Sequence, residues 1–168
     1  IMGPCRNSAV LVENFIPSDG RLLGILAVPK PDGQTLAVKG SGILNLTDTM
    51  ENGFVYFDLP EGAYRLFILF TTRTGGGRDH YMNLIDSSSV KVLLDEVYEK
   101  HYARYSKYFG NVIAGFFSDE PELGNVKGYP FDNMLGQKDI RLPWSDELER
   151  KLTETWKEEF LTNLPALW

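Results

Sequence analysis

Three carboxylates gather in the segment 118–122, where Asp119, Glu120 and Glu122 flank Pro121. Neighbouring carboxylates repel each other, and repulsion or burial raises the pKa of one of them, as a general acid working at neutral pH requires. Pro121 fixes its own φ and restricts Glu120 to an extended backbone, so the Glu120 side chain leaves the chain at a defined angle. Ordinary acidic turns that end a strand use the same residue types, and the spacing alone leaves both interpretations open.

The elements around this segment predict how it is positioned. Continuous apolar runs at 65–72 and 112–118 are typical of strands buried on both faces. Between them, residues 88–109 have helical spacing, with Asp86 or one of the three following serines as N-cap and Gly110 just past the end. These lengths predict a βαβ unit with parallel strands, whose carboxyl end is where catalytic groups gather in such sheets.

The predicted helix has one apolar face with spacings of three and four residues. We expect this face to be buried, with its histidine among core residues; it comprises Val90, Leu93, Leu94, Val97, His101, Tyr105 and Tyr108. A last helix is expected to begin after Ser145, a good N-cap, and to bury a stripe at four-residue steps. That stripe is Leu148, Leu152, Trp156 and Phe160.

Before about residue 75 the pattern is that of short strands separated by turns, which predicts a small antiparallel sheet. The expected strands are 9–12, 22–28, 35–38, 43–46 and 54–57, and the expected turns are 17–20, 29–33, 51–53 and 60–62. The predicted fold class is therefore α+β or α/β. We expect a β-rich module over 1–64, followed over 65–168 by the βαβ unit and a C-terminal helix.

Composition excludes several functional classes. The net charge is −6 and no Lys/Arg cluster occurs, so we expect no nucleic-acid partner. No apolar run approaches the roughly 20 residues needed to span a bilayer, so we expect no membrane partner. With one cysteine, Cys5, and two histidines, an internal disulfide is excluded, and we expect neither a metal site nor a cofactor.

Three segments carry a family resemblance: Tyr81–Asp86 (YMNLID), Tyr108–Pro121 (YFGNVIAGFFSDEP) and Leu142–Ser145 (LPWS). Together with the stretch 58–65, they resemble large bacterial (β/α)8-barrel glycoside hydrolases, closest to the α-L-rhamnosidase-like and related uncharacterised members. The resemblance covers roughly residues 43–168. It implies that 1–64 is an inserted β module and that 65–168 is a partial barrel segment.

In such barrels the general acid/base is a glutamate at the end of the fourth strand, and the residue that matches is Glu120. Many related barrels carry Asn where this chain has Asp119. We expect Asp119 to bind a sugar hydroxyl or to shift the pKa of Glu120. Because of this departure, the resemblance leaves open whether the enzyme retains or inverts the anomeric configuration. The resemblance also places His80, Tyr81 and Asn83 at the mouth of the site. With Asp119 and Glu122, these form the candidate carbohydrate-binding set.

Three hypotheses follow from these observations. In the first, the 168 residues are part of a glycosidase, because a closed barrel needs about 250 residues. The isolated chain is then inactive and lacks the second carboxylate, which the family takes from a later strand. In the second, the chain is a non-catalytic carbohydrate-binding or interaction module. In the third, it is an unrelated α+β domain with an acidic turn. Unpaired edges of strands 65–72 and 112–118 predict a homo-oligomer.

Overall fold

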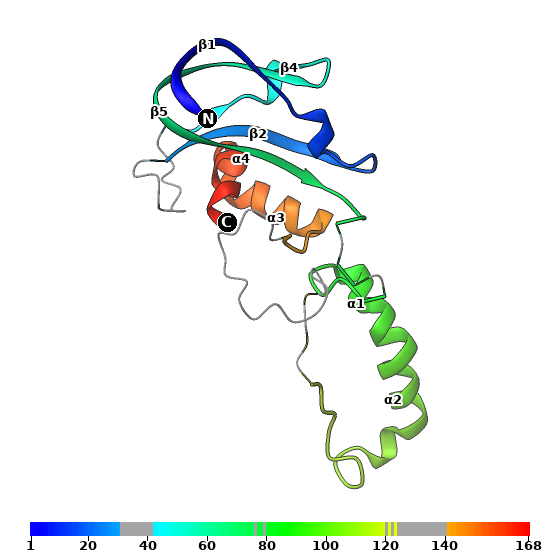
Figure 1. Ribbon diagram of the computed structural model, residues 1–168. Coiled ribbons are helices and arrows are strands. Elements are labelled where there is room, and N and C mark those ends of the chain that lie inside the picture. The colour runs from blue at the N-terminus through cyan, green and yellow to red at the C-terminus, as the bar shows by residue number, and fades with distance from the viewer. Residues whose placement is uncertain (31–41, 76, 79, 120, 122, 124–140) are drawn as a thin grey trace. The chain divides into compact units, whose positions relative to one another are not determined.

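The computed structural model describes residues 1–30, 42–75, 77–78, 80–119, 121, 123 and 141–168 (Figure 1). Within that part of the chain there are two compact units. The first holds the described residues up to Gly75 and from Leu152 onward, and the second holds those from Gly77 to Lys151. The division at Gly75 falls where the sequence pattern changes, whereas the expected boundary between 64 and 65 lies inside a strand.

The first unit is built on an antiparallel sheet of five strands in the order β1-β5-β2-β3, in which β4 also pairs with β5. The strands are β1 (Met2–Leu11), β2 (Arg21–Pro29), β3 (Leu44–Asn45), β4 (Met50–Glu51) and β5 (Phe54–Thr71). The long strand β5 joins the sheet together, because its first half pairs with β1 and its second half with β2 (Figure 1). A mixed α+β architecture with a β-rich first part is confirmed.

The core of the first unit is formed mainly by side chains of β2 and β5, and the burial pattern of these two strands shows which faces are covered. In β2 the consecutive residues 25–28 are all buried, as expected for a strand covered on both faces. In β5 the buried residues Val55, Phe57 and Leu59 alternate with exposed ones, which is the period of a strand with one face in solvent. Two short 3-10 turns, Glu13–Phe15 and Thr47–Thr49, connect the strands.

Turn chemistry explains one predicted turn and corrects another. Asn52 and Gly53 have φ of 50° and 80°, as a primed hairpin turn requires, so the predicted hairpin is confirmed. The turn predicted at 60–62 is wrong, because β5 runs straight through it. The strand is irregular at this point, as proline and glycine in a strand cause. Gly62 has φ of 137°, and the register of the paired β1 shifts between Gly3 and Cys5.

The C-terminal residues pack in the first unit after α3 (Asp146–Trp156). A 3-10 turn (Lys157–Glu159), α4 (Phe160–Asn163) and a final 3-10 turn (Leu164–Leu167) follow. Leu164 and Pro165 are buried, and Leu161 lies directly over Gly24 of β2. A Cβ atom at Gly24 would lie 2.5 Å from Leu161 Cδ1, so Leu161 would have to move to admit a side chain there.

The second unit contains one helical segment over residues 87–108. It consists of α1 (Ser87–Leu93), a π-helical turn (Leu94–Tyr98), α2 (Glu99–Tyr105) and a 3-10 turn (Ser106–Tyr108). Asp86 is the N-cap, since its Oδ2 accepts a 3.1 Å hydrogen bond from the Ser89 backbone N–H. Gly110, with φ of 83°, lies just past the end. The predicted helix, its cap and its end are confirmed.

The strand predicted over 112–118 is wrong. The backbone N–H groups of Val112 and Ile113 both donate to the Tyr108 carbonyl, forming a turn, and residues 114–119 have no regular structure. Every strand pairing of the described residues in the sheet is antiparallel, so the predicted parallel βαβ unit is not formed. A partial barrel is therefore not confirmed, and β5, which includes residues 65–71, lies inside the sheet between β1 and β2.

An aromatic cluster explains where residues 109–116 pack instead. It consists of Tyr98, Tyr102, Phe109 and Phe116, with ring centroids 5.2 Å apart for Tyr98 and Phe116, and 5.4 Å apart for Tyr102 and Phe109. Phe116 also lies 5.7 Å from Phe109. The first two contacts are edge-to-face and the third is tilted. Together they hold the segment against the helix that precedes it, and they need no strand partner.

The helix face predicted to be buried is largely exposed, which corrects a second expectation. His101 is exposed, not a core residue, and its Nδ1 lies 2.7 Å from the Val97 carbonyl oxygen. Tyr105 and Tyr108 are exposed as well. The aromatic cluster uses Tyr98 and Tyr102 instead, so the side of the helix that receives contacts is not the one that the apolar spacing indicates.

Candidate functional site

The predicted catalytic segment has only part of its residues in the described chain. Asp119 is exposed and lies in a segment without regular structure, after the apolar residues 112–117. Pro121 is exposed as well. Glu120 and Glu122 lie outside the described residues, so their roles as general acid and as sugar ligand stay predictions.

The three other predicted site residues, His80, Tyr81 and Asn83, lie in the loop before α1. His80 is exposed. Tyr81 is half-buried, and the guanidinium carbon of Arg78 lies 5.9 Å from the centroid of its ring, within reach of a cation–π interaction. The loop thus presents an imidazole and an aromatic ring, two groups that bind sugar hydroxyls and stack on sugar rings.

Asn83 organises this loop through its own hydrogen bonds. Its Nδ2 donates to the Trp144 carbonyl at 2.7 Å, and its Oδ1 accepts from the Ile85 backbone N–H at 3.2 Å. Its backbone N–H donates to Ser89 Oγ at 3.0 Å. Because both ends of the amide are engaged within the protein, Asn83 positions the loop that carries His80 and Tyr81.

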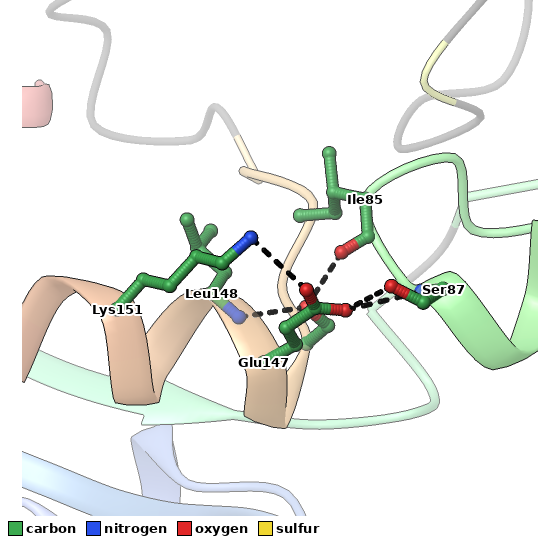
Figure 2. A network of polar contacts seen from close by, with 6 residues as sticks. Ile85, Ser87, Glu147, Leu148 and Lys151 are labelled. Carbon is green, nitrogen blue, oxygen red and sulfur yellow. Dashed lines mark hydrogen bonds and ion pairs between the residues drawn. The ribbon is translucent and has the colours of Figure 1, made fainter.

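The starts of α1 and α3 are joined by Glu147. Figure 2 shows its carboxylate between Ser87 and Lys151. The Ser87 hydroxyl donates a short hydrogen bond to Oε2, the Ser87 backbone N–H donates to the same oxygen at 3.4 Å, and Lys151 Nζ lies 3.0 Å from Oε1. The Ser87 hydroxyl, the Lys151 ammonium and the Ser87 N–H lower the pKa of Glu147 to about 2.

Ser145 makes a second link between the same two segments. Its Oγ accepts from the Leu148 backbone N–H at 3.0 Å, which confirms it as the N-cap of α3, and donates to the Ile85 carbonyl at 2.8 Å. Trp144 next to it donates its Nε1–H to Glu149 Oε2 at 2.9 Å. The indole is therefore held in place through its polar edge.

This arrangement is suited to binding more than to proton transfer. Asn83, Ser145 and Glu147 form a hydrogen-bonded frame, and the carboxylate of Glu147 is kept ionised by its donors, so it is a poor general acid. His80 and the Tyr81 ring are the groups that the frame presents. Sequence reasoning missed Ser87 and Glu147 because their partnership joins residues that are 60 positions apart.

A second polar cluster, in the first unit, was also missed. Asp19 Oδ1 accepts from the Thr72 and Thr74 hydroxyls at 2.8 Å each, and its Oδ2 accepts from the Arg73 backbone N–H at 2.8 Å. The two hydroxyls and then the N–H lower the pKa of Asp19 to about 2. The turn at 17–20 that carries Asp19 is visible in the sequence, but its contact with the end of β5 is not.

The described chain holds neither a candidate metal site nor a candidate membrane span. The residues outside the gaps contain no group of three or more His, Cys, Asp or Glu side chains that could hold a metal ion. Among the same residues no helix has the length and apolar character to cross a membrane.

Comparison of the chain with models of protein families, with curated proteins and with solved structures gives no match.

Proposed function

We propose that this chain carries the general acid, Glu120, of a glycoside hydrolase that cleaves O-glycosidic bonds. The second carboxylate comes from sequence outside residues 1–168, so the 168 residues alone are inactive. The observation that supports this is the exposure of the apolar stretch that leads into Asp119. Val112 is 76% and Phe117 is 89% exposed.

Exposed aromatic and aliphatic side chains are costly in water, and a run of them in one segment marks a surface that another element covers. Residues 112–117 form no strand in this structure; in the complete barrel we expect them to pair with a neighbouring strand on each side, which would cover that surface by backbone pairing and side-chain packing. The acidic residues would then follow the carboxyl end of a strand, where barrel enzymes place their catalytic groups.

The mechanism follows from the chemistry of paired carboxylates. Glu120 in its protonated form donates its proton to the glycosidic oxygen as the bond to the anomeric carbon breaks. Repulsion from Asp119 and Glu122 favours that protonated form at neutral pH. The second carboxylate attacks the anomeric carbon at a separation of about 5–5.5 Å, or activates a water at about 6.5–9.5 Å.

Substrate binding is assigned to the loop before α1. His80 donates to or accepts from a sugar hydroxyl, and the Tyr81 ring packs against the sugar face. Asn83 keeps both in place, since its amide holds the loop to the Trp144 carbonyl. Asp119 binds a hydroxyl of the sugar next to the cleaved bond.

The test is the dependence of hydrolysis on the leaving group, measured in the protein that contains this chain together with the rest of its barrel. We expect Glu120→Gln to lower kcat/KM about 10²–10⁴-fold for alkyl glycosides, and far less for dinitrophenyl glycosides, whose leaving group needs no proton. Glu158→Gln, on the exposed side of a 3-10 turn, is the control. Equal losses for both leaving groups, or none, would contradict the assignment.

A second candidate function is supported by the exposed aromatic residues of the second unit. Tyr102, Tyr105 and Phe117 are exposed, as the platforms of a non-catalytic carbohydrate-binding or interaction module are. This alternative predicts that the 168 residues bind a glycan on their own. A calorimetric titration against a glycan panel that gives no heat would count against it.

A further inference from the structure

The hairpin turn between β4 and β5 holds the one asparagine of the sequence that is followed directly by glycine, Asn52. Asn52 is exposed, and its side-chain amide makes no hydrogen bond to another residue of the described ranges. The backbone N–H of Gly53 likewise donates to no described backbone carbonyl. Because glycine has no side chain, its nitrogen is open to approach by the neighbouring amide carbon. Two groups that can react with each other are thus adjacent and unoccupied.

A second turn of the first unit shows the same kind of dipeptide with both groups occupied. The Gly20 backbone N–H donates to the Pro17 carbonyl at 2.8 Å. The carboxylate of Asp19, which precedes it, accepts hydrogen bonds from two threonine hydroxyls and a backbone N–H. The freedom of both groups is therefore a property of the Asn52-Gly53 turn and not of every turn with glycine in this unit.

We propose that Asn52 is a site of spontaneous deamidation, with water as the only co-reactant. The Gly53 nitrogen gives its proton to water and forms a bond to Cγ of Asn52, which closes a five-membered imide. The bond from Cγ to Nδ2 breaks, and Nδ2 takes up a proton and leaves as ammonia. Water then adds to one of the two imide carbonyls and opens the ring to aspartate or isoaspartate. One water is consumed, one ammonia is released and no electron is transferred.

The anchoring of the turn controls when the ring can close. Asn52 is in the left-handed region, with φ of 50°, and ring closure requires rotation about its Cα–C bond. The Gly53 carbonyl resists this rotation, because it accepts from the Val12 and Glu13 backbone N–H groups at 2.8 Å and 3.1 Å. A turn at the tip of a hairpin opens at a lower free-energy cost than the strands around it. The reaction therefore proceeds in the folded chain through local opening of the turn.

Deamidation changes both the charge and the backbone at this junction. A Cβ atom at Gly53 would lie 2.5 Å from Glu13 Oε2, so the Glu13 carboxylate lies against the turn, and a carboxylate at position 52 adds a like charge near it. Isoaspartate also lengthens the backbone of a two-residue turn, whose length sets the register of β4 on β5. The modified turn holds β4 and the end of β1 less firmly. This inference goes beyond the proposed function and does not rest on it.

The first experiment follows the reaction by peptide mapping in a mass spectrometer. The folded chain is kept at neutral pH in water labelled with heavy oxygen and is digested in ordinary water, so that label at an asparagine reports only the incubation. We expect labelled product at Asn52 well before any at Asn83, whose amide is hydrogen-bonded at both ends and which precedes a leucine. Equally slow labelling of the two asparagines overturns the proposal.

The second experiment tests the effect on the fold by thermal unfolding. The deamidated chain, separated by ion exchange, is expected to unfold at a lower temperature than the unmodified chain. Asn52→Asp isolates the charge, since aspartate followed by glycine also suits this turn. Glu13→Gln is expected to recover part of the stability that Asn52→Asp loses, and Glu61→Gln, at an exposed position of β5, is the matched control. Unchanged unfolding of the deamidated chain, or equal recovery by both glutamines, overturns the proposed loosening at Glu13.

Discussion

At the scale of single residues, Glu147 shows how one carboxylate can hold two helix starts in a defined arrangement. It accepts hydrogen bonds from Ser87 at the start of α1 while standing in the first turn of α3, and it pairs with Lys151 one turn later. A negative charge in the first turn of a helix also interacts favourably with the helix dipole. The loop of His80 and Tyr81 precedes this junction in the chain and is held by the hydrogen bonds of Asn83.

The Glu147 carboxylate makes the folding stability of the chain depend on pH in a specific way. Its pKa is about 2 in the folded chain against an ordinary value of 4.5, so folding favours the ionised form. The resulting stabilisation is fully present above pH 4.5 and is lost as the pH falls from there toward 2. We expect Glu147→Gln to lower the thermal midpoint at neutral pH, and the difference from the unmodified chain to vanish toward pH 2.

Thermal unfolding of both proteins across that pH range measures this, with Glu154→Gln as the matched control. Glu154 is an exposed glutamate of the same helix. A difference between unmodified and Glu147→Gln chains that stays constant from pH 7 to pH 2 would show that the side chain acts through packing and not through its charge.

At the scale of elements, the contact of Gly24 with Leu161 fixes how the C-terminal residues lie on β2. β2 has a register shift between Leu22 and Gly24, and a side chain at Gly24 would force Leu161 to move. We expect Gly24→Ala to destabilise the chain by about 1–3 kcal/mol, because the added methyl group clashes with Leu161 and forces one of the elements to move.

Urea unfolding followed by circular dichroism gives the size of this effect. Gly115→Ala is the matched control, since a Cβ atom there meets nothing within 4 Å. If Leu161→Ala restored most of the stability lost in Gly24→Ala, the clash would be confirmed as the cause. Equal effects of the two glycine substitutions would contradict it.

The same elements show which parts of the fold and of the candidate site the sequence predicts. The Asn52-Gly53 hairpin and the caps Asp86 and Ser145 depend on residues a few positions apart, and their positions follow from local chemistry. The strand at 112–118 depends on a distant partner that its own sequence does not specify. Packing of Phe116 on Tyr98 and Phe109, within one stretch of chain, takes its place.

The candidate site also combines features that local sequence predicts with contacts between distant residues that it does not. That the loop of His80, Tyr81 and Asn83 precedes a capped helix is readable from the sequence. Other contacts join residues more than 50 positions apart. The Asn83 side-chain amide donates to the Trp144 carbonyl, and Asp19 accepts hydrogen bonds from the hydroxyls of Thr72 and Thr74. Spacing within one segment carries no information about such pairs.

At the scale of the whole molecule, burial is distributed unequally between the two units. Every buried apolar residue in the described chain belongs to the first unit, and in the second unit only Ser145 is buried. A unit with few buried apolar groups opens at a lower free-energy cost than one with a core. The two units are therefore expected to differ in local stability even though they belong to one chain.

Hydrogen exchange measured at low protein concentration tests this difference. Backbone amides of α2 (Glu99–Tyr105) are expected to exchange well before those of Ile25–Val28 in β2, because β2 opens only when the core opens. Equal protection of both segments would show that the two units unfold together.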